Sequence, residues 1–321
     1  MQICEVGTLK DLVVESGKLF GPRVFLEHHL GSKTISFSYL KASELVEKIG
    51  KGLCSIGIGK GDRVGLVAPN SPEWIVSFFA TAFIGAIVVP IDPTLPPEEI
   101  ANVLIFAKAK AVFCDLRRSS FLEKIFSERG WRSILIKIDQ PLENFSMDDI
   151  RNRGAATNGL LLPDVKKEDV AAYFLTSGTN GTPRVVALSH YNFLSNALGA
   201  RTNIPTYSDD NALCILPLTH TYSFTAGLLM FFVVGAKITI LNSYKPYRIF
   251  ETIEKTGVSI IPAVPLFLQL FHDNIIDKLE EAGLPKRILF KMLFIVSALT
   301  SFIGIPLGKI LFRGIRKKFG P

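Results

Sequence analysis

Residues 176–186 read TSGTNGTPRVV and form the densest cluster of small and hydroxylated residues in the chain. Backbone N–H groups of such a loop can converge on an anion, because glycine permits close approach and positive φ, and hydroxyl groups add donors. Arg184 would add a guanidinium fork suited to phosphate. These residue types fit a phosphate site and an ordinary surface loop equally well. They do not form a Walker A loop, because no G-x-x-x-x-G-K-[ST] occurs in the sequence.

The elements on either side of this loop must position it. An apolar run, VAAYFLTS at 170–177, precedes the loop and predicts a strand, and a helical pattern with Ser189 as N-cap follows it. We therefore expect a strand–loop–helix unit. Similar Val- and Ile-rich runs, bounded by Gly, Pro, Asn or Asp, recur at 63–69, 86–92, 111–115, 133–139, 212–218, 236–241 and 258–265.

Helical patterns lie between these apolar runs. One begins at Ser38 as N-cap, and another begins at Ser71 with Pro72 in its first turn. The runs do not alternate cleanly, as expected for strands buried on both faces, so the sequence predicts an α/β fold with mostly parallel sheets. A more polar stretch at 138–169 indicates a connection between two stacked lobes. The predicted parts are a first α/β lobe over 1–165, a second with the loop over 166–285, and a basic apolar segment over 286–321.

The composition excludes several classes of protein. Hydrophobic residues make up 48% and charged residues 20%, which excludes disorder. Cys4, Cys54, Cys114 and Cys214 fit neither a CxxC metal site nor a dense disulfide framework, so we predict no metal site and reduced thiols. The N-terminus has no basic region followed by an apolar one, so we expect a cytoplasmic protein. The mean hydropathy of +0.32 nevertheless indicates membrane contact.

The net charge of +7 resides at the C-terminal end. Residues 282–321 contain eight basic and no acidic residues, while the rest of the chain carries 28 basic and 29 acidic ones, which argues against nucleic-acid binding. Residues 292–308 carry no charge, but 17 residues is the lower limit for a spanning helix, and Pro306 weakens a straight one. An in-plane apolar segment with a basic rim and a buried helix are the alternatives. We predict contact between 286–321 and an anionic membrane surface.

The stretch YFLTSGTNGTPRVVALSHYN resembles the phosphate-binding signature of the adenylate-forming superfamily, which includes acyl-CoA synthetases, luciferases and peptide-synthetase adenylation domains. Asn180 replaces a usual threonine, Arg184 the usual lysine and Val185 the usual glycine. The similarity continues in order through GIGKGDRVGL, PNSPEW, VPIDP, PLTHTYSF and VSIIPAVPLFLQLF. The last segment, KILFRGIRKKFGP, resembles one of long-chain acyl-CoA and acyl-carrier-protein synthetases, which favours a long-chain fatty acid as substrate.

This resemblance implies the N-terminal domain of an adenylate-forming enzyme and a two-step reaction. The loop would hold the β- and γ-phosphates of Mg²⁺-bound ATP while a fatty acid carboxylate attacks the α-phosphorus. The acyl group would then pass to coenzyme A or to a carrier-protein phosphopantetheine. His220, in PLTHTYSF, would be the catalytic candidate near the acyl and α-phosphate pocket, or else a helix-entry histidine satisfied by backbone. The residues assigned to ATP binding are Thr176, Ser177, Gly178, Thr179, Asn180, Gly181 and Arg184.

Several motifs of complete members are absent from the sequence. They are a GG-A-P-like turn, a Y-G-x-T-E-like segment, a ribose-binding aspartate and the domain with the catalytic lysine. We therefore expect an incomplete fold, the front part of a long-chain fatty acid ligase, which does not complete adenylation alone. The alternatives are an inactive, membrane-associated nucleotide- or acyl-binding remnant, and one subunit of a split enzyme whose second chain carries the missing motifs.

Overall fold

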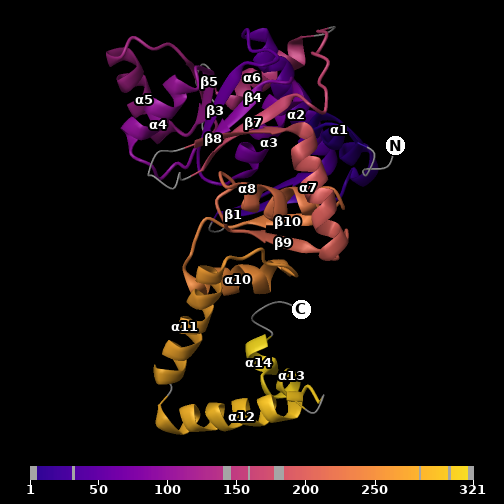
Figure 1. Ribbon diagram of the computed structural model, residues 1–321, viewed down its shortest axis with the longest axis vertical. Coiled ribbons are helices and arrows are strands. Elements are labelled where there is room, and N and C mark those ends of the chain that lie inside the picture. Colours follow the sequence, from indigo (N-terminus) through magenta and orange to yellow (C-terminus); the bar gives the residue numbers. More distant parts are fainter. Residues whose placement is uncertain are drawn as a thin grey trace.

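The computed structural model describes residues 6–30, 33–139, 146–157, 160–176, 184–281, 283–302 and 305–316. Within these ranges the chain forms two sheets with a layer of helices between them (Figure 1). Neighbouring strands run parallel in both sheets, except in the β1–β2 and β7–β8 pairs. The predicted α/β fold with mostly parallel sheets is confirmed.

The larger sheet has six strands in the order β6-β5-β3-β4-β7-β8. Its central strands β3 and β4 are buried at nearly every position, because helices cover both faces, and this explains why their sequences do not alternate. The antiparallel edge strand β8 is mostly exposed. The strands are β3 (Arg63–Val67), β4 (Ile87–Pro90), β5 (Ala109–Cys114), β6 (Ile134–Lys137), β7 (Val170–Thr176) and β8 (Arg184–Ser189).

The smaller sheet has four strands in the order β2-β1-β10-β9. They are β1 (Val24–Leu30), β2 (Lys33–Ser38), β9 (Asn211–Cys214) and β10 (Lys237–Ile240). Each sheet therefore contains strands from before and after residue 165. The two sheets do not divide at this residue, and the predicted lobe boundary there stays a prediction. The strand expected at 258–265 is reduced to one bridge, Ala212 to Ile260, because Pro262 lacks an N–H donor and a helix begins at Pro265.

The helices begin at the predicted caps. In each case the serine hydroxyl accepts the backbone N–H of the third residue after it, at 3.0 to 3.2 Å. The caps are Ser38 of α2 (Tyr39–Ser55), Ser71 of α3 (Pro72–Phe83) and Ser189 of α7 (His190–Asn203). The other helices that cover the sheets are α1 (Leu9–Phe20), α4 (Pro97–Phe106), α5 (Leu116–Glu128), α6 (Met147–Ala156) and α10 (Pro246–Thr256).

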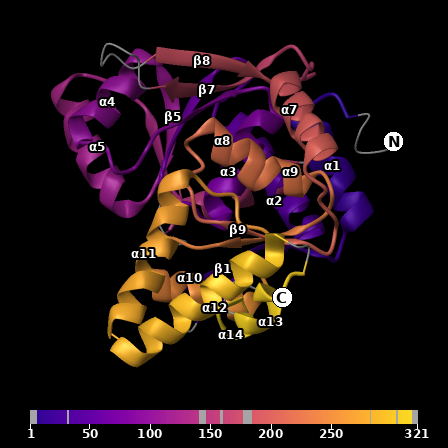
Figure 2. The same ribbon diagram turned by 60° about the horizontal axis from the view of Figure 1, so that its bottom comes forward.

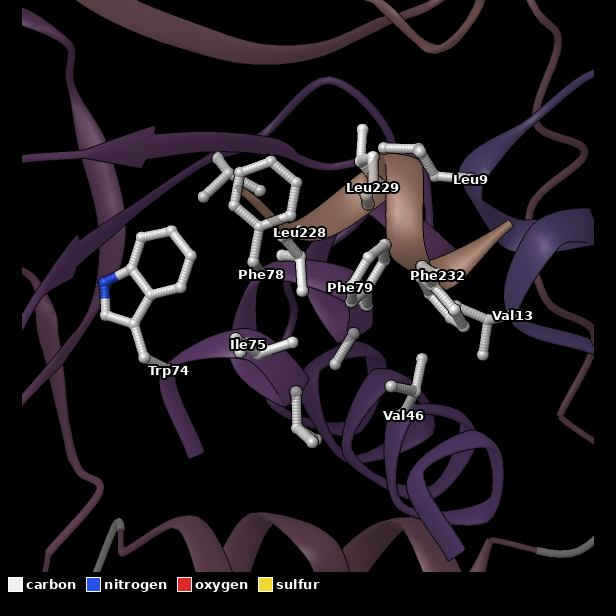
Figure 3. Packing of buried hydrophobic residues seen from close by; sticks show 14 of the residues in the cluster. Leu9, Val13, Val46, Trp74, Ile75, Phe78, Phe79, Leu228, Leu229 and Phe232 are labelled. Atoms are coloured by element: carbon white, nitrogen blue, oxygen red, sulfur yellow. The ribbon is translucent and has the colours of Figure 1, made fainter. Parts of the chain in front are cut away.

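The main hydrophobic core lies in the helical layer between the two sheets. There, side chains of α3 pack against the segment after β9, which consists of α8 (Thr221–Phe224), a π-helical turn (Thr225–Leu229) and α9 (Met230–Phe232) (Figure 3). The ring centroids of Phe78 and Phe224 are 4.2 Å apart, and those of Phe79 and Phe232 are 5.0 Å apart. Burial of such side chains stabilises the fold by about 1.5–3 kcal/mol each, so this segment is firmly anchored.

A helical arm extends from the four-stranded sheet (Figures 1 and 2). It consists of α11 (Pro265–Glu281), α12 (Leu284–Phe302), α13 (Gly308–Leu311) and α14 (Arg313–Arg316). No residue of α12 is buried, although its Phe290 ring lies 5.3 Å from that of Phe312 beside α13. Among the described helices, none combines the length and apolar character needed to span a bilayer.

Candidate active site

Thr176 and Arg184 mark the two ends of the predicted phosphate loop. Thr176 is the last residue of β7 and Arg184 the first of β8, and they pair in the antiparallel register. The Thr176 hydroxyl donates to the Arg184 carbonyl oxygen at 3.4 Å. The expected strand–loop–helix unit is therefore wrong, because the loop joins two strands and α7 begins only after β8. The β-branched pair Val185–Val186 favours this extra strand.

Five of the predicted ATP-binding residues lie outside the described residues, so their roles stay predictions. They are Ser177, Gly178, Thr179, Asn180 and Gly181. Thr176 and Arg184 are exposed, and Arg184 makes no ion pair with any carboxylate in the described part of the chain. Both side chains are therefore accessible to a ligand that approaches the loop.

The carboxyl ends of strands from both sheets meet on one side of the molecule. The loop follows β7, which runs parallel to β4 and β3, while His220 follows β9, which runs parallel to β10 and β1. Asn70, just after β3, is hydrogen-bonded to the segment between β9 and His220. Ligands of open α/β sheets bind outside the carboxyl ends of the strands, so this side is where a ligand would contact both predicted elements.

His220 occupies the N-cap position of α8, and its side chain is exposed. Its backbone N–H donates to the Pro217 carbonyl at 3.2 Å, and its own carbonyl accepts the N–H of Phe224 at 2.9 Å. The imidazole makes no hydrogen bond to any described residue. The alternative that His220 is a helix-entry histidine satisfied by backbone groups is therefore not supported within the described part of the chain. The π-helical turn that follows is a feature often found at functional sites.

Asn70 was not among the residues predicted from the sequence, although it belongs to the PNSPEW segment. Its position in the sequence could have indicated a role at the edge of the sheet. Asn70 lies between the end of a buried strand and the N-cap Ser71, where the chain leaves the sheet. Only the tertiary structure identifies its partners, which lie about 150 residues further along the chain.

His190 matches the histidine of the family signature, yet it lies in the interior. Its Nδ1 accepts the backbone N–H of Leu9 at 3.1 Å, at the start of α1, and its Nε2 is buried without a partner among the described residues. Burial lowers the pKa of His190 to about 4, against the opposing effects of Asp169 and Asp11. His190 is thus a neutral link between α1 and α7 rather than a phosphate ligand.

The described residues place no group of three His, Cys, Asp or Glu side chains where they could hold a metal ion. The exposed Arg184 and the exposed Thr176 hydroxyl beside the loop suit a polyphosphate. The imidazole of His220, which has no hydrogen-bond partner among the described residues, is accessible from the same side.

Comparison with known sequences identifies one matching family and several relatives that the chain matches in part. The AMP-binding enzyme family matches residues 20–321. A 4-coumarate–CoA ligase of Vanilla planifolia is 28% identical over 299 residues, with 88% of this chain and 50% of the relative covered. A 4-coumarate–CoA ligase of Humulus lupulus is 31% identical over 225 residues (68% and 40% covered), and a peroxisomal long-chain acyl-CoA synthetase of Arabidopsis thaliana is 27% identical over 308 residues (90% and 43% covered). The chain thus spans at most about half the length of these curated relatives.

Solved structures have the same fold at low sequence identity. A long-chain-fatty-acid–CoA ligase of Archaeoglobus fulgidus superposes with a TM-score of 0.76 at 23% identity, with 85% of this chain and 54% of that chain covered. A putative long-chain-fatty-acid–CoA ligase of Rhodopseudomonas palustris gives 0.73 at 23% identity, with 83% and 65% covered. With the family match over nearly the whole sequence, this chain belongs to the AMP-binding enzyme family.

Proposed function

We propose that this chain provides the ATP- and acyl-binding part of an acid–thiol ligase. The observation that carries the proposal is the placement of Thr176, Arg184 and His220 at the carboxyl edges of two sheets that Asn70 ties together. Arg184 and the loop would hold the terminal phosphates of Mg²⁺-bound ATP. His220 would lie beside the α-phosphate, where the acyl carboxylate attacks.

The proposed reaction has two steps. A carboxylate oxygen bonds to the α-phosphorus while the bond to the β-phosphate oxygen breaks, which releases pyrophosphate and leaves an acyl-adenylate. The thiol of coenzyme A or of a carrier-protein phosphopantetheine then displaces AMP at the acyl carbon. The contribution of Arg184 is positive charge that stabilises the departing pyrophosphate.

We propose a long-chain fatty acid as the acyl substrate. The similarity of residues 309–321 to long-chain synthetases supports it, as does the long-chain acyl-CoA synthetase among the relatives. The 4-coumarate–CoA ligases among the same relatives make an aromatic acid the competing substrate class. Calorimetric titration of the chain with palmitate and with 4-coumarate, each in the presence of Mg·ATP, separates the two.

Replacement of Arg184 by alanine is expected to weaken Mg·ATP binding by about tenfold to a hundredfold, because a charge-assisted hydrogen bond contributes about 1.5–3 kcal/mol. Isothermal titration calorimetry measures the change. Arg132→Ala is the matched control, because exposed Arg132 precedes β6 at the amino edge of the same sheet and its loss changes the net charge equally. Equal affinities of the wild type and Arg184→Ala would contradict the assignment of Arg184.

The second candidate function is an inactive nucleotide- or acyl-binding remnant. One observation favours it: Val185 adds a side chain next to the loop where the family signature has glycine. Exchange of radioactive pyrophosphate into ATP with a fatty acid present distinguishes the candidates. An inactive remnant is expected to give no exchange, and exchange by this chain alone would contradict that candidate. Exchange that appears only after a second chain is added would support a split enzyme.

We further propose that a cytoplasmic chain contacts an anionic membrane through α12. The face of α12 opposite α13 exposes a regular apolar stripe, in which each residue is 51% to 93% exposed. The stripe consists of Ile288, Met292, Ile295, Leu299 and Phe302. Basic residues flank the uncharged run 292–308 in the sequence, and residues 282–321 contain no acidic ones, so the charge of this segment complements an anionic lipid surface better than a second copy of itself.

The full chain is expected to float with liposomes that contain anionic phosphatidylserine, and removal of 286–321 is expected to abolish flotation. Ile295→Glu with Leu299→Glu should weaken it strongly, because carboxylates oppose both insertion and attraction. Phe106→Glu is the matched control, since Phe106 is 78% exposed on α4, away from the arm. Unchanged flotation of the α12 variant would reject the membrane proposal. So would light scattering that shows a stable dimer for the wild type and a monomer for the α12 variant.

A further inference from the structure

Both polar atoms of the Asn70 side-chain amide form hydrogen bonds to a segment that follows a strand of the other sheet. It is 7% exposed and follows β3 in the centre of the six-stranded sheet. Its Nδ2 donates to the Leu216 carbonyl at 2.8 Å, and its Oδ1 accepts the Leu218 N–H at 3.0 Å. Leu216 and Leu218 lie just after β9, so these bonds fix the carboxyl end of β9 against that of β3.

Asn242 closes the same junction from a third strand. It follows β10, and its Nδ2 donates to the Asn70 backbone carbonyl at 2.7 Å. The ends of β3, β9 and β10 are therefore joined by two asparagine side chains. The loss of either donor would leave a backbone carbonyl without its hydrogen bond, at a cost of about 1–3 kcal/mol if the carbonyl stays shielded from water.

The position of this junction in the chain gives it a consequence beyond local stability. Only Thr219 separates Leu218 from His220, and the His220 N–H is itself bonded to the Pro217 carbonyl, so a shift of the held segment moves His220. On the other side, β3 is joined through β4 to β7, the strand that ends at Thr176. Asn70 thus lies on a hydrogen-bonded connection between the segment before His220 and the β7–β8 hairpin.

We propose that Asn70 is a positioning residue that sets the distance between His220 and the β7–β8 hairpin. The inference rests on the proposed function in one respect, which is that His220 and the β7–β8 hairpin would bind the same ligand. A buried asparagine that merely anchors a loop would affect stability alone, whereas a positioning residue also changes the separation of two elements that both remain folded.

The test measures that separation by electron–electron double resonance in the full chain. Spin labels are attached at Ala187→Cys on β8 and Thr221→Cys next to His220, both exposed positions. Cys4 and Cys54 are replaced, while Cys114 and Cys214, buried to 0% and 3% exposure, stay unlabelled. We expect one narrow distance distribution in the parent protein and a shifted or broadened one in Asn70→Asp. In this variant a carboxylate oxygen replaces the Nδ2 donor and repels the Leu216 carbonyl oxygen.

Ser71→Ala is the matched control, since it removes the adjacent cap of α3 at a cost of about 1 kcal/mol without touching the held segment. It should leave the distance distribution unchanged. If Asn70→Asp fails to fold, Asn242→Ala, which removes only the bond to the Asn70 carbonyl, should broaden the distribution in the same sense. An unchanged distribution in the folded asparagine variants overturns the inference.

A second readout separates this inference from the proposed function. Affinity for a fatty-acyl sulfamoyl adenosine, a stable mimic of the acyl-adenylate, should fall about tenfold in Asn70→Asp and stay constant in Ser71→Ala. If the wild type does not bind this mimic while the distances change as expected, the proposed function fails and the positioning role stands.

Discussion

Between pH 6.5 and pH 4 the free energy of unfolding is expected to fall by about 3 kcal/mol through His190 alone. The folded-state pKa of His190 is about 4, below the ordinary value of 6.5, because burial disfavours the imidazolium. In this window the unfolded chain binds a proton that the folded chain does not. The stabilisation is therefore complete above pH 6.5 and is lost as the pH falls toward 4.

The groups around His190 fix the sign of this effect. Burial is the largest effect and lowers the pKa of His190, and Lys60 acts in the same direction, whereas Asp169 and Asp11 raise this pKa without reversing the shift. Asp169 is held by Lys60 at 2.6 Å and has a lowered pKa of its own, so it loses its contribution only below its ordinary pKa of 3.8. The interval between pH 5 and 6.5 thus reports chiefly on histidine.

Urea unfolding at several pH values checks this prediction. His190→Asn is the informative variant, because its side-chain oxygen can still accept the Leu9 N–H but does not titrate in this range. We expect its stability to depend less steeply on pH than that of the wild type. Burial also lowers the pKa of His28, so His28→Asn serves as the comparison that measures the other histidine contribution. Parallel curves for the wild type and His190→Asn would show that the assignment is wrong.

Gly154→Ala is expected to destabilise the chain by about 3 kcal/mol, at the upper end for overpacking. A Cβ on Gly154 would lie 1.7 Å from the Lys48 carbonyl oxygen, and one on Gly52 would lie 1.9 Å from the Ile150 carbonyl oxygen. The backbones of α2 and α6 meet here, and neither obstacle is a flexible side chain. An added methyl group therefore forces the two helices apart.

Chemical denaturation followed by far-ultraviolet circular dichroism measures this effect. Gly199→Ala is the matched control, because Gly199 lies within α7 and a Cβ there meets no atom within 4 Å. It should stabilise the chain by about 0.5–1 kcal/mol through helix propensity. A Gly154→Ala protein as stable as the wild type would show that α2 and α6 do not pack closely.

Local pattern was sufficient for much of this fold. The apolar runs without alternation predicted buried parallel strands, which the structure confirms except at 258–265, and Ser38, Ser71 and Ser189 predicted three helix starts, all confirmed. These features depend on neighbours within a few residues, so the sequence carries them directly. The family signature likewise identified the AMP-binding family from one ordered set of short motifs.

Features that depend on distant partners came only from the tertiary structure. The loop after Thr176 joins two strands because β8 finds an edge of the six-stranded sheet, and β1 joins β10 across more than 200 residues. The burial of His190 against Leu9 and the bonds of Asn70 to Leu216 and Leu218 are of the same kind. The sequence by itself determined the elements and the family. Tertiary packing decided which strand ends share an edge, and therefore where His220 lies relative to the β7–β8 pair, because such hydrogen bonds form only between segments that folding brings together.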